Sequence, residues 1–231
     1  MKPTPVLTLA LAALLLPLAA CAADEKDFSP AEKLLFTTDQ LSTLRLPATL
    51  KYGFRKSGTL EEGYEDKVAV AITPGADGKC CNGRGEFLTG ARKLPMPDVE
   101  GATGNPVLMY FLERELREMQ RLTKGSQSHF RKQIRMAIYG GATVRDVSLT
   151  YRGKEVKGQE VLIAPYLDDP NRPKFEKLAV KEYRFWLSEA VPGGVFGIRA
   201  RAPGATADAP PLLMEELLAE GAAAPMVAPN R

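Results

Sequence analysis

The sequence predicts an α+β domain in which a curved antiparallel sheet packs on a central two-helix hairpin. Three observations lead to this fold class. Apolar residues alternate with a period of two on both sides of residues 105–139, which is typical of half-buried strands. Within 105–139 they recur every three or four residues, as on one face of a helix. The order of strands, two helices and more strands differs from the alternating βαβ units of parallel sheets.

Composition sets the broad class. The chain has 231 residues, of which 45% are hydrophobic and 26% charged, so it can build a core and is not wholly disordered. Its net charge of +3 is too small to predict a nucleic-acid partner. A single histidine excludes any site that needs two, and we expect no cofactor and no metal.

The N-terminus predicts export. Lys2 precedes an apolar run from Val6 to Ala20, which is shorter than the roughly 20 residues of a membrane-spanning helix. We therefore interpret residues 1–20 as a signal peptide.

The four residues Leu18-Ala19-Ala20-Cys21 resemble the lipobox of bacterial lipoproteins. The resemblance implies that Cys21 is lipidated, becomes the mature N-terminus and anchors the chain to a membrane. Ala22 stands where an aspartate would direct retention in the inner membrane, so the resemblance implies the outer membrane, with the domain facing the periplasm. The alternative is an ordinary signal-peptidase site that leaves Ala23 as the first residue.

The mature chain divides into three parts. Residues 21–45 are expected to be a lipidated tether with one short helix, which Ser29-Pro30 begins and which runs to about Phe36. Residues 46–203 form the single α+β domain. Residues 204–231 are rich in alanine and proline, and we expect a mobile tail that is dispensable for folding, with one possible short helix at 212–218.

Strands are expected before and after the helices. The first group covers 51–56 and 64–72, with a weaker strand at 79–89. The second group covers 146–151, 160–166, 182–188 and 196–201. Two residues in each of four of these strands are expected to point inward: Tyr52, Phe54, Val68, Val70, Tyr183, Phe185, Phe196 and Ile198.

The helical hairpin carries an apolar stripe on each helix, which includes Leu112, Leu116, Met119, Phe130 and Ile134. We expect these residues to cover the inward strand residues, either as a solid core or around an apolar pocket. If a pocket forms, the expected binding residues are Tyr52, Phe54, Val70, Leu116, Phe130, Tyr183, Phe185 and Phe196.

Charged residues are dense on the same hairpin. Glu113, Glu115 and Glu118 alternate with Arg114, Arg117 and Arg121, which predicts a solvated face with ion pairs. With Lys124, Arg131, Lys132 and Arg135 the hairpin is locally basic, and it could touch anionic headgroups or an acidic partner.

Two further features could carry chemistry. Cys80-Cys81 could form a redox-active pair or contribute to a metal site, although two small residues in a strand or loop explain the pair better. His129 could act as a catalytic base, but no Gly-x-Ser-x-Gly motif accompanies it, and its neighbours Ser126 and Ser128 are better explained as helix caps.

The order of elements across residues 50–203 is similar to that of the half-open β-barrel of periplasmic lipoprotein carriers and their outer-membrane receptors. That resemblance implies a sheet that wraps over helices and encloses an apolar cavity. We therefore expect a non-enzymatic, membrane-anchored binding module for a lipid, another hydrophobic ligand or an envelope protein. The alternatives are an envelope hydrolase or redox enzyme that uses His129 or Cys80/Cys81, and a structural component of an envelope complex.

Overall fold

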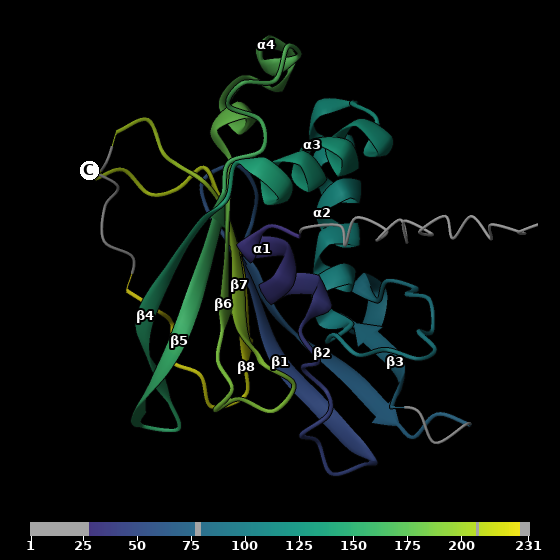
Figure 1. Cartoon of the computed structure of the whole chain (residues 1–231). Helices are drawn as coiled ribbons and strands as arrows, with labels where there is room; N and C mark the ends of the chain where they lie inside the picture. The colour runs from purple at the N-terminus through teal and green to yellow at the C-terminus, as the bar shows by residue number, and fades with distance from the viewer. Residues whose placement is uncertain (1–27, 77–79, 207, 227–231) are drawn as a thin grey trace, which may run out of the picture.

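The computed structural model describes residues 28–76, 80–206 and 208–226, and it contains one eight-stranded antiparallel sheet with helices on one face (Figure 1). The strand order is β3-β2-β1-β8-β7-β6-β5-β4. This confirms the predicted α+β class. The strands are β1 (Ala48–Ser57), β2 (Tyr64–Thr73), β3 (Asn82–Phe87), β4 (Thr143–Tyr151), β5 (Lys154–Ile163), β6 (Glu182–Leu187), β7 (Val195–Ala202) and β8 (Leu213–Ala219).

The register of strand pairing in these hairpins follows from two features of the sequence, the alternation of apolar side chains and the residues at the turns. In β1–β2, Tyr52 pairs with Val68 and Leu50 with Val70, so apolar side chains of both strands share one face. In β4–β5, Arg152 and Gly153 have φ angles of 50° and 74°, which a two-residue hairpin turn of the type I′ class requires. The predicted strands before and after the helices are thus confirmed, with shifts of a few residues at their ends.

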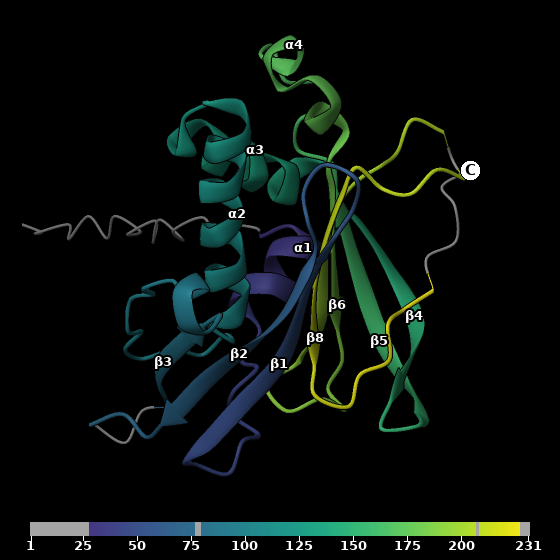
Figure 2. The ribbon, with the colours of Figure 1, turned by 180° about the vertical axis from the view of Figure 1, so that it is seen from behind.

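The central hairpin consists of α2 (Val107–Thr123) and α3 (Gln127–Gly140). The Ser126 side chain accepts a hydrogen bond from the backbone N–H of His129, so Ser126 caps α3 as predicted. The helices pack on the inward face of the sheet, and every strand and helix residue that the pattern placed there is buried in one core. Figure 2 shows from behind that α1, α2 and α3 lie on the same side of the sheet.

A short helix precedes the sheet, as expected. It consists of α1 (Pro30–Glu32) and a π-turn, η1 (Lys33–Thr37), and Ser29 and Glu32 form a capping box at its start. Ala31, Leu35 and Leu41 are buried in the common core. The packed domain therefore begins before residue 46, where we expected its boundary.

The segment after residue 203 differs most from the prediction. Residues 213–219 form β8, which lies between β1 and β7 in the middle of the sheet. The expected mobile tail with a short helix at 212–218 is therefore wrong for this segment. Leu213, Leu217 and Ala219 point into the core, and such burial outweighs local helix preference.

Three short helices occupy the connections: η2 (Gly90–Arg92), α4 (Arg172–Phe175) and η3 (Glu176–Val180). The segment after β8 returns along the outer face of the sheet, where the backbone N–H of Ala223 donates to the carbonyl of Thr150 on β4. Farther on, Arg199 on β7 donates to the carbonyl of Pro225. The outer face of the sheet is thus partly covered near β4 to β7. The inner face of the sheet, near the β4–β5 hairpin, is not covered by α2 or α3 (Figure 1).

Candidate functional site: a groove beside an edge strand

An open groove of about 1070 Å³ lies between the N-terminal segment and the β4–β5 hairpin. The segment around η1 forms one wall, the two strands form the other, and the loop after β6 closes one end. Its apolar lining is Leu34, Val147, Leu187, Ala190 and Val191. More of its lining residues are polar or charged: Thr38, Asp39, Gln40, Thr43, Asp146, Ser148, Lys157, Gln159, Ser188 and Glu189.

The strand wall of the groove is polar because of its register. Asp146 pairs with Gln159, and Ser148 pairs with Lys157, across the β4–β5 ladder. Gln159 donates a hydrogen bond from Nε2 to Asp146 Oδ1 at 3.3 Å, so both side chains lie on the same face of the sheet. Farther along, the same face carries Val161, which is fully buried under the helices. The inner face therefore changes from apolar to polar where the helices end.

The opposite wall is held in place by buried amides. Gln40 donates from Nε2 to the carbonyl of Leu34 at 3.0 Å and accepts from the backbone N–H of Asn105 at 2.8 Å. Asn105 in turn donates from Nδ2 to the Tyr52 hydroxyl and to the carbonyl of Gly193, both at 2.8 Å. These bonds connect the N-terminal segment, the start of α2 and the sheet, so the wall is preorganised.

Strand β4 is an edge of the sheet. Its outward backbone groups alternate, and the bond between Ala223 and Thr150 identifies Thr150 as one of them. By the same period of two, Ser148, Asp146 and Val144 also present their backbone N–H and C=O groups outward. Within the described residues, no strand pairs with β4 on that side between residues 143 and 149. At the other edge, residues 94 and 99 pair with β3 and cover it.

The residues expected to bind a ligand lie elsewhere. Tyr52, Phe54, Val70, Leu116, Phe130, Tyr183, Phe185 and Phe196 are each 3% exposed or less, and none lines the groove. The structure thus places them in the packed layer between sheet and helices. The groove was missed because its lining comes from four separated segments with no common motif.

The sequence also did not predict a buried charge cluster, which is formed by Arg114, Glu115, Lys181 and Glu215. Lys181 Nζ lies 2.5 Å from Glu115 Oε2 and 3.4 Å from Glu215 Oε2. Arg114 donates to Glu115 at 3.0 Å and to Glu215 at 2.8 Å. The side chains of Lys181, Glu115 and Glu215 are fully buried. The predicted solvated face is therefore wrong for Arg114 and Glu115, because α2 turns them toward β8.

The two carboxyl groups of this cluster differ in acidity. Burial and the adjacent charge of Glu215 raise the pKa of Glu115 to about 8. Burial also opposes ionisation of Glu215, but the charges of Lys181 and Arg114 outweigh it and lower the pKa of that carboxyl. Burial lowers the pKa of Lys181, and the two glutamates outweigh that effect and raise it. Of the two carboxyl groups, Glu115 is therefore the one that takes up a proton first as the pH falls.

The cluster continues to the surface. Lys56 on β1 contacts Glu118 and Glu61, each at 2.6 Å, and Glu215 at 3.9 Å. Arg121 completes this outer part with bonds to Glu61 at 2.6 Å and Glu118 at 2.8 Å. Hydrogen bonds from Arg121 and then Lys56 lower the pKa of Glu61, against its burial. The whole array joins α2 to two strands, β1 and β8, and to the residue that precedes β6.

His129 joins α3 to the segment before α4. Its Nε2 lies 2.6 Å from Asp169 Oδ2, and its ring packs against Phe130 and Phe175. Asp169 also accepts from the backbone N–H of Asn171 at 2.7 Å. Ser126 and Ser128 bond to each other at 2.6 Å. This geometry explains His129 as a link between α3 and the 164–180 segment.

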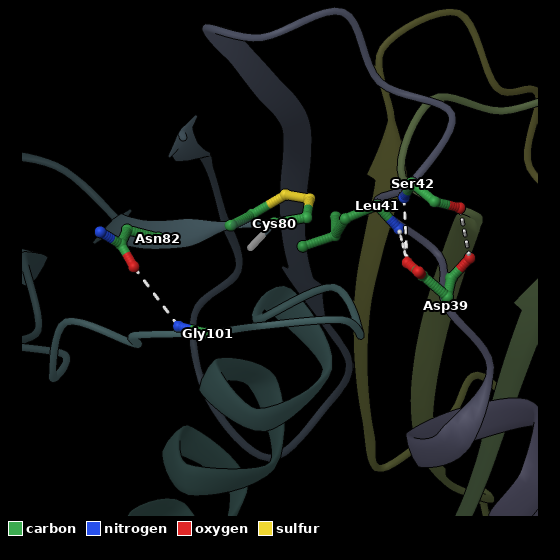
Figure 3. The surroundings of a disulfide bond; sticks show 7 residues. Asp39, Leu41, Ser42, Cys80, Asn82 and Gly101 are labelled. Atoms are coloured by element: carbon green, nitrogen blue, oxygen red, sulfur yellow. Dashed lines mark hydrogen bonds between the residues drawn. A yellow bond between two sulfur atoms is a disulfide. The ribbon is translucent and has the colours of Figure 1, made fainter. Parts of the chain in front are cut away.

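Cys80 and Cys81 are joined by a disulfide bond at the start of β3. Figure 3 shows Leu41 pointing toward this bond, with the backbone N–H of Gly101 donating to Asn82 on the other side. The Cys81 carbonyl accepts from the backbone N–H of Ala102 at 2.7 Å. In the part of the chain that the structure describes, no group of three or more His, Cys, Asp or Glu side chains is arranged to hold a metal ion.

Cys21 and the signal peptide lie outside the described residues. Among the helices that are described, none is both long and apolar enough to span a membrane.

Comparisons with known proteins give only weak structural likeness. No protein family matches the sequence, and no curated protein matches it. Among solved structures, the lipoprotein LppX of Mycobacterium tuberculosis superposes with a TM-score of 0.33 at 8% sequence identity. The match covers 78% of this chain and 88% of that one. A superposition this loose carries no functional conclusion, so the function proposed next depends on this chain's own residues.

Proposed function

We propose that this chain is a bacterial envelope lipoprotein, anchored through Cys21, whose domain binds an extended segment of another envelope protein in the groove. The observation that carries the proposal is the position of the groove beside the free edge of β4. The binding is non-enzymatic. The lipobox supports the anchor, and Ala22 supports the outer membrane with the domain in the periplasm.

An unpaired strand edge is a template for another strand. An extended segment laid along β4 would pair with the outward N–H and C=O groups of Val144, Asp146 and Ser148, which supplies affinity without regard to sequence. Every second side chain of that segment would then point toward the inner face. The groove would receive those side chains, which supplies selectivity.

The lining indicates the chemistry of the bound segment. Three carboxylates, Asp39, Asp146 and Glu189, line the groove against one cation, Lys157. Leu34 and Leu187 add apolar surface on opposite walls. This combination favours a segment that carries both a basic and an aliphatic side chain, because charge complementarity raises the rate and the specificity of binding.

An acyl chain fits this groove less well. Lipid tails gain free energy from apolar walls, and the polar side chains here would lose hydration without gaining hydrogen bonds. The aromatic residues that would suit an acyl chain are the buried residues of the core. A lipid ligand is therefore the competing result of the test below.

A proline at the β4 edge tests the proposal. Ser148→Pro removes one outward N–H, and an edge strand tolerates proline where its N–H faces outward. A photo-crosslinking residue at Gln159, in the groove, should yield a protein adduct in intact cells. The same residue at Lys67, exposed on the outer side of β2, should not.

Ser148→Pro should reduce the Gln159 adduct at least about fivefold while the thermal midpoint of the purified chain stays within a few degrees. An adduct of undiminished yield would contradict pairing at the edge. Mass spectrometry that finds a lipid, and no protein, attached at Gln159 would replace the protein partner by a lipid.

A further inference from the structure

One surface of the helical layer has no role in the groove. Apart from Gly140, which carries no side chain, the exposed residues on α3 are Ser128, Arg131, Lys132, Arg135, Met136 and Tyr139. With 3.6 residues per turn, these positions fall within an arc of about 140°. The opposite side of the helix carries Phe130, Ile134 and Ile138, which are buried in the core. We call the exposed residues 131–139 the α3 stripe.

The α3 stripe combines cations with exposed apolar side chains. Met136 is 52% exposed and Tyr139 is 57% exposed, although both are large and apolar. Lys132 and Arg135 have no ion-pair partner among the described residues, whereas Arg131 lies 2.9 Å from Glu113. No acidic residue lies on α3 itself. Unpaired cations beside an interfacial aromatic residue are the composition of helices that lie on anionic lipid surfaces.

The chain enters the domain at the C-terminal end of the same helix. Ser29 donates from Oγ to the carbonyl of Ile138 at 3.1 Å, so residue 29 is bound one residue away from Tyr139 along α3. Phe28, which precedes it, is 40% exposed. Two exposed aromatic residues, Phe28 and Tyr139, are therefore each next in sequence to a residue of the Ser29–Ile138 hydrogen bond.

The distance to the anchor is limited by the chain. Phe28 is seven residues after Cys21. Seven residues span at most about 25 Å even when fully extended. The α3 helix itself is about 21 Å long, from its 14 residues at 1.5 Å each. A lipid on Cys21 therefore keeps this helix within reach of the membrane surface at all times, which turns a weak affinity into frequent contact.

We propose that the α3 stripe rests on the surface of the membrane in which Cys21 is anchored, with Lys132 and Arg135 on anionic lipid headgroups and Tyr139 at the interface. The proposal depends on the proposed anchor. It directs the helical side of the domain toward the membrane. One docked orientation would follow, because the tether enters the domain beside Tyr139, at one end of the stripe.

Fluorescence with brominated lipids tests this contact. The chain has one tryptophan, Trp186, which is 1% exposed and should not be quenched by lipids. A Tyr139→Trp variant of the full lipidated chain, in phosphatidylcholine vesicles with phosphatidylglycerol, should be quenched by brominated lipids. In phosphatidylcholine alone the quenching should be weaker.

Lys132→Gln with Arg135→Gln, added to Tyr139→Trp, should lower the docked-to-free ratio about 25-fold, because each cation contributes about a fivefold preference for an anionic surface. The matched control is Lys51→Gln with Lys67→Gln, which removes the same charge from exposed positions on the outer side of β1 and β2 and should change nothing.

Flotation of the same vesicles separates the two claims. If the chain floats but Tyr139→Trp is not quenched, or if the control pair reduces quenching equally, the α3 contact is contradicted and the anchor stands. If the wild-type chain does not float with the vesicles, the anchor is contradicted and the proposed contact with it.

Discussion

Removal of the Lys181 charge tests whether this cation compensates the buried carboxylates of Glu115 and Glu215, as the short distances between them imply. Lys181→Met keeps a long, flexible side chain but removes the cation that contacts both Glu115 and Glu215. Removing one partner from a buried ion pair leaves an uncompensated charge, which costs about 3–5 kcal/mol. Arg114 still neutralises one carboxylate, and the raised pKa of Glu115 lets that carboxyl take up a proton once Lys181 is gone, so we expect a value near the lower limit, about 3 kcal/mol.

A second substitution should restore part of that loss. Glu115→Leu in the Lys181→Met background removes both members of one pair and leaves Arg114 with Glu215. Replacing a buried ion pair by apolar residues of similar size is often neutral. The double variant should therefore be more stable than Lys181→Met alone by about 2 kcal/mol.

Equilibrium urea unfolding, followed by the fluorescence of Trp186, measures these differences. The slope of the free energy against urea should be the same in all variants, so that midpoints compare directly. A loss below about 1 kcal/mol for Lys181→Met, or a double variant whose loss equals the sum of the two single losses, would refute the described cluster.

Three further predictions concern the core. Truncation after Pro203 removes β8 from the centre of the sheet, and circular dichroism should show no cooperative thermal transition, since two buried leucines alone contribute about 3–6 kcal/mol; a transition within a few degrees of wild type would contradict the strand. Leu116→Ala should cost about 2–5 kcal/mol in urea unfolding, as a cavity in a solid core, and a smaller loss would indicate a gap under α2. The free energy of unfolding should fall by up to about 1.4 kcal/mol per pH unit from about pH 5 to 8, because burial and the Glu215 charge raise the pKa of Glu115 and only the folded chain keeps that proton. Glu115→Gln should remove this slope, and an unchanged slope in that variant would show that another group causes it.

The sign of the last prediction follows from proton counting. Between the ordinary glutamate pKa of 4.5 and the raised value near 8, the folded state binds one proton more than the unfolded state. Raising the pH therefore favours unfolding over that interval. The lowered pKa values of Glu215 and Glu61 act in the opposite direction, but only below about pH 4.5.

Local patterns were enough to predict most of the fold. The strands around Tyr52 and Val70 alternate with a period of two, and the helix through Leu112 and Leu116 repeats every four residues. Ser126 marks the start of α3 by its ability to accept a backbone hydrogen bond. Each of these signals is contained within about a dozen residues, so it does not depend on distant partners.

The errors share one physical cause, which is a partner far away in the sequence. Glu215 lies in the middle of β8, in the segment 212–218 for which the sequence predicts a short helix. It is stable in a buried strand only because Lys181 and Arg114 reach it from two other elements. The same contacts remove Glu115 from the solvated face that the alternation of charges on α2 predicts. No short-range pattern contains that information.

The groove could not be predicted for a related reason. Its walls come from residues near 34–43, 146–148, 157–159 and 187–194, which meet only after the sheet has formed. The free edge of β4 depends on the strand order, and the strand order depends on where β8 inserts. A sequence that predicts a mobile tail at 204–231 therefore cannot predict which strand lies at the edge of the sheet.

The most direct test of the central claim is the mass of the mature chain, purified from the membrane fraction of bacterial cells that express it. An anchored envelope lipoprotein should begin at Cys21 and carry the added mass of its acyl groups on that residue, and Cys21→Ala should abolish both the added mass and the membrane association. A soluble chain that begins at Ala23 with no added mass would contradict the anchor, the membrane-facing α3 stripe and the envelope partner inferred from them.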